Sequence, residues 1–162
     1  MLRSLRDQNR FALYCLLAGA AAFLAAASSS GLALLSLHWI AEQPDAIPRR
    51  DLPVTQPFFW LLAGLVAPLL ETLIYRWLLT LLTRHLRLPL ALGLASLLAG
   101  AAHGPYPVAF FATSASFFVY ALAWHHWRHV SSRKSYWAPA TAHAISNSLI
   151  VASAFLISMI YV

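Results

Sequence analysis

The chain has few charged side chains, very few acidic ones and a single cysteine. Only 10% of its 162 residues are charged, whereas a soluble domain carries about 25%. The acidic residues are Asp7, Glu42, Asp45, Asp51 and Glu71. Cys15 alone can form neither an intramolecular disulfide nor a CxxC metal site. These shortages exclude a water-soluble enzyme and a disulfide-rich secreted domain.

Two common hydrolase motifs are missing, and the basic residues are not arranged for nucleic acid. The chain contains no Gly-x-Ser-x-Gly and no His-Glu-x-x-His pattern. The formal net charge is +6, but the basic side chains stand between apolar runs and do not form one continuous patch. We therefore predict no nucleic-acid partner.

The chain is rich in long apolar runs. Hydrophobic residues make up 60% of it, and no charge interrupts residues 11–41, 52–70, 88–127 and 135–162. A membrane helix needs about 20 apolar residues, and the Gly-Pro break after His103 divides the third run. We expect an all-α, polytopic membrane helix bundle that forms a single domain over residues 1–162. Its five helices are predicted at residues 11–39, 58–82, 88–103, 107–127 and 137–160.

The distribution of Lys and Arg predicts how the bundle is oriented in the lipid bilayer. With a cytoplasmic N-terminus, the inner side holds Arg3, Arg6, Arg10, Arg84, Arg87, Arg128, Arg133 and Lys134. The outer side holds only Arg49 and Arg50, in a proline-rich loop at residues 41–57. Because cytoplasmic loops carry the excess of Lys and Arg, we expect the N-terminus inside and the C-terminus outside.

The first predicted helix allows a second interpretation as a secretory signal peptide. Basic residues precede its apolar stretch, as they do in signal peptides. The apolar run, however, continues well beyond the 7–15 residues that are typical of a signal peptide. We therefore expect an uncleaved anchor helix at residues 11–39.

Ionisable side chains inside a membrane are rare and usually face the bundle interior for a functional reason. Glu71 lies near the middle of the second predicted helix. Tyr75 shares its face, while Thr72 and Arg76 share the neighbouring face. A buried Glu–Arg pair that only fixes helix packing is the alternative to a functional site.

Two further predicted helices also bring polar groups into the membrane. His103 ends the third helix, and His143 and Asn147 lie one turn apart on the fifth, so that their side chains point the same way. Three helices that each carry such groups are harder to explain by packing alone. A Glu, two His and an Asn together suit the activation of water and the stabilisation of an oxyanion.

These residues resemble the motifs of the CPBP family of intramembrane proteases, which includes CAAX prenyl endopeptidases and bacteriocin-processing enzymes. The family's Glu-Glu-x-x-x-Arg motif is matched by residues 71–76, its Phe-x-x-x-His motif by residues 99–103 and its His-x-x-x-Asn motif by residues 143–147. The chain departs from the pattern at two positions. Thr72 stands in place of the second Glu, and Ala99 stands in place of the Phe.

The resemblance implies an intramembrane endopeptidase of the glutamate type. It implies that Glu71 and His103 polarise the attacking water, and that His143 and Asn147 donate hydrogen bonds to the oxyanion. The expected roles of three neighbours are structural or substrate-positioning: Arg76, Thr72 and Tyr75. The implied substrate is a membrane-anchored protein or peptide, cut near a C-terminal tail, and no cofactor is expected.

The resemblance also suggests a location and a branch of the family. The family-like core covers about residues 58–160, preceded by the anchor helix. This compact size resembles a bacterial branch that processes C-terminal sorting tails. We therefore expect a multi-pass protein of a bacterial or archaeal inner or plasma membrane.

Three alternatives remain open on the sequence. Glu71, His103 and His143 form a ligand set that zinc accepts, with water in the fourth position. The chain could also be a non-catalytic membrane scaffold or an immunity-type protein that binds peptides. A small proton-coupled transporter is the third alternative, with Glu71 and His103 as its relay.

Overall fold

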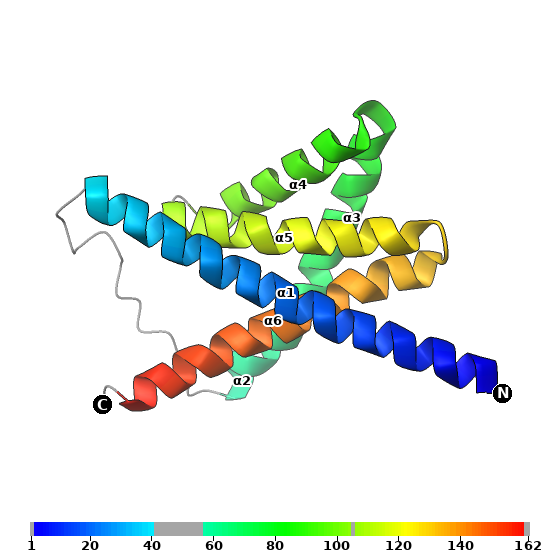
Figure 1. The fold of residues 1–162 in the computed structure, drawn as a ribbon, viewed down its shortest axis with the longest axis horizontal. Coiled ribbons are helices and arrows are strands. Elements are labelled where there is room, and N and C mark those ends of the chain that lie inside the picture. The colour runs from blue at the N-terminus through cyan, green and yellow to red at the C-terminus, as the bar shows by residue number, and fades with distance from the viewer. Residues whose placement is uncertain (1, 41–56, 105, 161–162) are drawn as a thin grey trace.

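A computed structural model describes residues 2–40, 57–104 and 106–160. The elements in chain order are α1 (Leu2–Ile40), α2 (Pro57–Leu61), the π-helical turn η2 (Leu62–Val66), α3 (Ala67–His85), α4 (Leu88–Ala102), α5 (Pro107–Arg128) and α6 (Ser132–Ile160). α2, η2 and α3 follow one another without a break and form one long helix (Figure 1). The described part of the chain is therefore an all-helical bundle of five helices, as predicted. Most of the predicted loop at 41–57 lies outside the described residues.

The bounds of α4 and α5 agree with the prediction to within one residue, whereas α1 and α6 begin earlier than predicted. α4 ends at Ala102 and α5 begins at Pro107, so the predicted break at residues 103–107 is confirmed. α1 begins at Leu2 and α6 at Ser132, each several residues earlier than predicted. Apolar composition marks the part of a helix that suits lipid, whereas charged and polar residues can continue the same helix into water. Helices α1 and α6 therefore begin before the predicted apolar ranges.

Three helices in the described residues are long and apolar enough to cross a membrane. These segments are Asp7–Gly31, Leu62–His85 and Pro107–Arg128. α4 is apolar but shorter, with 15 residues, in agreement with the short third helix that was predicted. Large apolar side chains such as Leu17, Ile74 and Leu90 are more than half exposed on the outside of the bundle, which suits contact with lipid.

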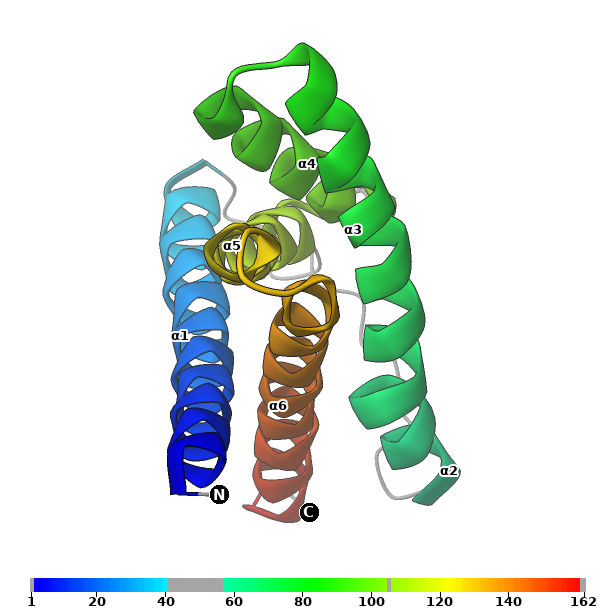
Figure 2. The same ribbon diagram turned by 90° about the vertical axis from the view of Figure 1, so that its right-hand side faces the viewer.

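Helix α5 lies in the middle of the bundle. It contacts α1, α4 and α6, while α3 closes the remaining side against α4 and α6 (Figure 2). α1 is more than a preceding anchor, because it packs closely on both α5 and α6. At Gly19 an added Cβ would meet the Ile145 side chain at 2.8 Å. Ser116 in α5 donates a hydrogen bond of 3.1 Å to the Ala22 carbonyl in α1.

The connections that carry basic residues gather at one side of the bundle. The N-terminus, the α3–α4 turn and the α5–α6 turn lie toward the right in Figure 1, and the C-terminus lies at the left. Arg84 and Arg87 flank the first of these turns, and Arg128 and Arg133 flank the second. The arrangement suits the predicted orientation, which itself stays a prediction.

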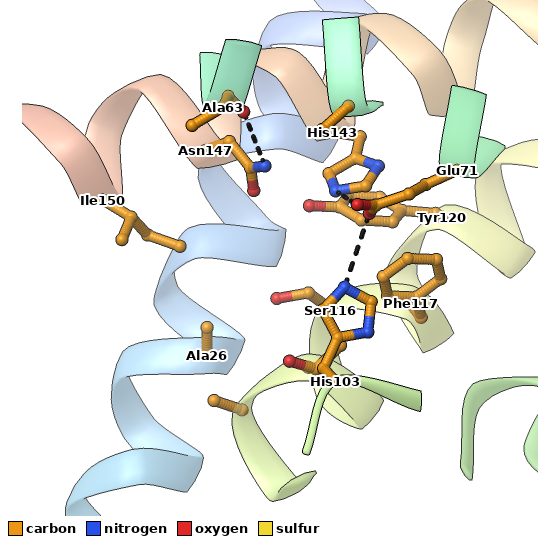
Figure 3. A pocket seen from close by; sticks show the side chains of 13 residues that line it. Ala26, Ala63, Glu71, His103, Ser116, Phe117, Tyr120, His143, Asn147 and Ile150 are labelled. Carbon is orange, nitrogen blue, oxygen red and sulfur yellow. Dashed lines mark hydrogen bonds and ion pairs between the residues drawn. The ribbon is translucent and has the colours of Figure 1, made fainter. Parts of the chain in front are cut away.

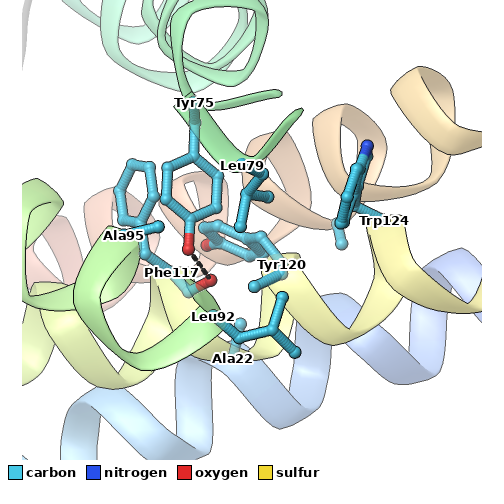
Figure 4. Close-up of a cluster of buried hydrophobic side chains, with 10 residues drawn as sticks. Ala22, Tyr75, Leu79, Leu92, Ala95, Phe117, Tyr120 and Trp124 are labelled. Carbon is cyan, nitrogen blue, oxygen red and sulfur yellow. Dashed lines mark hydrogen bonds between the residues drawn. The ribbon is translucent and has the colours of Figure 1, made fainter. Parts of the chain in front are cut away.

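A buried cluster ties α3 to α4 and α5 next to the polar site. Tyr75 is almost fully buried, and its hydroxyl donates to the Phe117 carbonyl at 3.0 Å (Figure 4). The same hydroxyl lies 2.9 Å from Ser96 Oγ in α4. The Tyr75 and Phe117 rings meet edge to face, with centroids 4.7 Å apart. These contacts hold α3 at a defined rotation, one helical turn after Glu71.

Candidate active site

Glu71, His103 and His143 come from three helices and meet at one point. Glu71 Oε2 lies 3.4 Å from His103 Nε2 and 3.6 Å from His143 Nε2. Figure 3 shows the carboxylate between the two imidazole rings. The Glu71 side chain is 35% exposed and the His103 side chain 36%, so solvent reaches both groups. The site is thus closed by protein on the His143 side and open on the His103 side.

His103 is oriented by the end of α4. Its backbone N–H donates to the Gly100 carbonyl at 3.1 Å, and its Nδ1 lies 2.7 Å from the Ala99 carbonyl. Because a carbonyl only accepts hydrogen bonds, Nδ1 carries a proton, and a hydrogen bond between Nε2 and the Glu71 carboxyl group needs a second proton on one of those two groups. The chain then turns through Gly104, whose φ of 128° is unfavourable for other residues. The end of α4 therefore fixes the position of the imidazole.

His143 is held in the opposite wall, where it is only 3% exposed. Its ring stacks on Tyr120 with centroids 4.7 Å apart and meets the edge of Phe117 at 5.1 Å. Thr72 Oγ1 lies 3.4 Å from His143 Nδ1, at the long end of hydrogen-bond distances. A hydroxyl that donates to Nδ1 leaves the proton on Nε2, which points at Glu71. Thr72 thus favours a His143 that donates toward the site.

Asn147 lies one turn beyond His143 and makes a contact that the sequence did not suggest. Its Nδ2 donates a hydrogen bond of 3.0 Å to the Ala63 carbonyl in the π-helical turn η2. The carbonyl can only accept, so the amide nitrogen must face Ala63. One of the two amide N–H groups is used in this contact, and the other remains for a further acceptor.

All four predicted catalytic residues line a single cavity of about 260 Å³. These four residues come from the second, third and fifth predicted helices, but α5 and α1 contribute to the lining as well. The additional lining residues are Ala26, Ala63, Ala67, Ala112, Thr113, Ser116, Phe117, Tyr120 and Ile150. Thr113, Ser116 and Tyr120 are spaced to share one face of α5, and this spacing was the signal in the sequence that could have identified the missing wall.

A second, apolar cavity reaches the same carboxylate from between α3 and α4. Its volume is about 230 Å³, and it shares Glu71, His103 and Phe117 with the first cavity. The rest of its lining is almost entirely apolar: Ile74, Tyr75, Leu78, Leu98, Ala99 and Ala102. Glu71 is therefore approached by a polar space on one side and by an apolar space on the other.

The three residues predicted to have structural or positioning roles have separate partners. Arg76 donates a hydrogen bond of 3.0 Å to Ser132 Oγ, which links α3 to the beginning of α6. Thr72 is buried against His143, and Tyr75 belongs to the core beside Phe117. Thr72 and Arg76 lie one turn apart on α3, as the helix spacing predicted, but their side chains bond to His143 and Ser132 respectively. Arg76 lines neither cavity.

The remaining question about the donor set is whether it suits a metal ion. In residues 2–40, 57–104 and 106–160, no group of three His, Cys, Asp or Glu side chains is arranged to hold one. Glu71 and the two imidazoles contact one another directly. Zinc binding at Glu71, His103 and His143 stays a proposal, for which chelation is the test.

Comparison with known proteins identifies a family for this chain. No curated protein and no solved structure matches it. Residues 53–149 match the family described as type II CAAX prenyl endopeptidase, Rce1-like. This match covers more than half of the chain and includes Glu71, His103, His143 and Asn147, whereas Ala26 and Ile150, which also line the cavity, lie outside it. The family is one of proteases, and together with the three apolar helices it supports an integral membrane protein. The chain belongs to the Rce1-like family of type II CAAX prenyl endopeptidases.

Proposed function

We propose that the chain is a glutamate-type intramembrane endopeptidase that cuts a membrane-tethered protein near its C-terminal tail. The observation that carries the proposal is the meeting of Glu71 with His103 and His143 in a cavity inside an apolar bundle. A carboxylate placed beside imidazoles is suited to move protons. Membership of a protease family supports peptide hydrolysis as the reaction.

In the proposed reaction a water molecule binds beside Glu71 and His103, within hydrogen-bond reach of both, on the open side of the site. Glu71 accepts a proton as the water oxygen forms a bond to the scissile carbonyl carbon. Collapse of the tetrahedral intermediate breaks the C–N bond, and the same proton passes to the leaving nitrogen. The products are a carboxylic acid and an amine, so that atoms and charge balance without a cofactor.

The oxyanion that forms during this attack needs donors on the other side of the cavity. His143 Nε2–H and the second amide N–H of Asn147 are proposed for this role, because both residues line the same wall. Tyr120 and Thr72 keep the His143 ring in place by stacking and by contact with Nδ1. Arg76 and Tyr75 act as structural residues that hold α3 against α6 and α5.

The two cavities suggest how a membrane-anchored substrate binds. The polar cavity accommodates the extended peptide, whose backbone groups need hydrogen-bond partners in a membrane. The apolar cavity between α3 and α4 accommodates an apolar group of the substrate next to Glu71. We propose that the chain works as a multi-pass protein of a bacterial or archaeal plasma membrane, in the compact branch that processes C-terminal sorting tails.

The decisive variant is Glu71→Gln, which keeps the shape of the side chain but cannot accept a proton. Masses of membrane-tethered proteins are compared between cells with the wild-type chain and cells with the variant. The uncut substrate should accumulate in the variant, with cleavage reduced by about 10²–10⁴-fold. Asp7→Asn, on the exposed beginning of α1, is the matched control and should cleave normally. Full cleavage by Glu71→Gln at normal expression contradicts the mechanism, and binding without cleavage by the wild type indicates a scaffold.

A further inference from the structure

Pro68 interrupts the hydrogen bonding of the long helix that carries Glu71. The helical backbone continues through Leu61, Val66 and Ala67, so Pro68 lies inside a continuous helix from residue 57 to residue 85. Its side chain is fully buried. Proline has no backbone N–H, so one carbonyl in the preceding turn loses its helical donor.

The π-helical turn decides which carbonyl this is. The Ala67 N–H donates to the Leu62 carbonyl, five residues earlier, as in a π-helix. The next donor in that pattern would be residue 68, and its acceptor would be the Ala63 carbonyl. Because residue 68 is proline, this pattern offers the Ala63 carbonyl no backbone donor from its own helix.

Asn147 supplies the missing donor from another helix. Its Nδ2 lies 3.0 Å from the Ala63 carbonyl oxygen. An unsatisfied carbonyl in a membrane interior is strongly unfavourable, so this bond constrains the turn. Tyr136, also in α6, donates to the Leu69 carbonyl at 3.1 Å. α6 therefore holds backbone carbonyls on both sides of Pro68.

The turn determines where Glu71 points. Each residue of an α-helix advances the direction of its side chain by about 100°, so a π-helical turn changes the rotation of everything after it relative to everything before it. Glu71 follows Pro68 by less than one turn. Ala63 and Ala67 also line the cavity, so the turn forms part of its wall.

We infer that Pro68 and Asn147 form a clamp on this turn, in which Pro68 frees the Ala63 carbonyl and Asn147 binds it. Pro68 is thus a positioning residue for the Glu71 carboxylate. Asn147 has two roles, because one amide N–H donates to the Ala63 carbonyl and the other donates to the oxyanion. The effect of the clamp on catalysis rests on the proposed function. The hydrogen bond between Asn147 and the Ala63 carbonyl does not, and it can be tested without a substrate.

The test is a double-mutant cycle with Pro68→Ala and Asn147→Ala in the full-length chain. An alanine at 68 provides the N–H that can serve the Ala63 or the Gly64 carbonyl, so that Asn147 is no longer required there. Asn147→Ala should therefore lower the melting temperature in detergent clearly in the wild-type background. In the Pro68→Ala background the same change should produce less than half of that shift. Pro89→Ala is the matched control, since Pro89 lies in the first turn of α4, where no N–H is needed.

Measurement of kcat and KM distinguishes an effect on the position of Glu71 from an effect on the stability of the fold alone. On the substrate identified with Glu71→Gln, Asn147→Ala should lower kcat with little change in KM. Its fold-loss should be smaller by about tenfold or more in the Pro68→Ala background, where only the oxyanion contact is lost. In the Pro89→Ala background the fold-loss should be unchanged.

The two proposals fail in different ways. Equal melting shifts and equal fold-losses of kcat in the Pro68 and Pro89 backgrounds would overturn the clamp. A wild-type chain that cuts nothing would overturn the proposed function, while the melting temperatures would still decide whether the clamp exists. Asn147→Leu, which fills the space, replaces Asn147→Ala in the cycle if the alanine variant does not fold.

Discussion

Thr72 faces His143 and not Arg76, with 3.4 Å between its hydroxyl oxygen and Nδ1 of the imidazole. Thr72 is the position at which the chain departs from the double-Glu motif of the CPBP family. Arg76 instead bonds to Ser132 at the beginning of α6. The departure therefore changes the surroundings of a proposed oxyanion donor and leaves the Glu71 carboxylate in place.

Removal of the Thr72 hydroxyl should reduce cleavage only moderately. Thr72→Val keeps the shape of the side chain but cannot orient Nδ1 of His143. One neutral hydrogen bond contributes about 0.5–1.5 kcal/mol, so kcat should fall by about tenfold at most. Thr80→Val is the matched control, because Thr80 Oγ1 bonds only to the Arg76 carbonyl of its own helix. A loss as large as that of Glu71→Gln would assign the hydroxyl a direct role in the reaction.

Close packing of α1 on α6 should depend on Gly19. Any Cβ at this position meets Ile145 at 2.8 Å and the Ala142 carbonyl at 3.0 Å. Gly19→Val should lower the free energy of unfolding by about 1–3 kcal/mol, through forced separation of the two helices. Thermal melting in detergent measures this effect. Gly31→Val, on the same helix with no atom within 4 Å of an added Cβ, should melt close to the wild type, and equal shifts would show that α1 does not pack on α6 there.

Chelation should leave cleavage unchanged if Glu71 activates water without a metal. The purified chain is treated with a zinc chelator, the chelator is removed, and cleavage is measured before and after zinc is added. Loss on chelation and recovery with zinc would instead support the zinc site at Glu71, His103 and His143. Zinc content after purification is an independent measurement that requires no substrate.

Labelling with a membrane-impermeant thiol reagent should establish the orientation. Cys15 is buried and is first replaced by serine to give a cysteine-free background. Arg87→Cys and His129→Cys, both at exposed positions, should react only from the cytoplasmic side, and Asp45→Cys only from outside. The reverse pattern would show that the N-terminus lies outside.

Local sequence determined the helices and most of the candidate site. Apolar runs predict helices that suit lipid, and the Gly-Pro break correctly predicted where α4 ends and α5 begins. The four-residue spacing of His143 and Asn147 placed both on one wall of the cavity. These features depend only on neighbours along the chain, because helix geometry fixes the relation between residues one turn apart.

The tertiary structure alone decided the partners across helices. Nothing in the spacing of residues indicated that Thr72 faces His143 or that Asn147 binds the Ala63 carbonyl. Each of these contacts depends on the rotation and depth at which two helices pack. Those quantities arise from close approach at small residues such as Gly19 and from the π-helical turn before Pro68. Hydropathy cannot predict them, because any face of an apolar helix is equally suited to lipid until a neighbouring helix covers it.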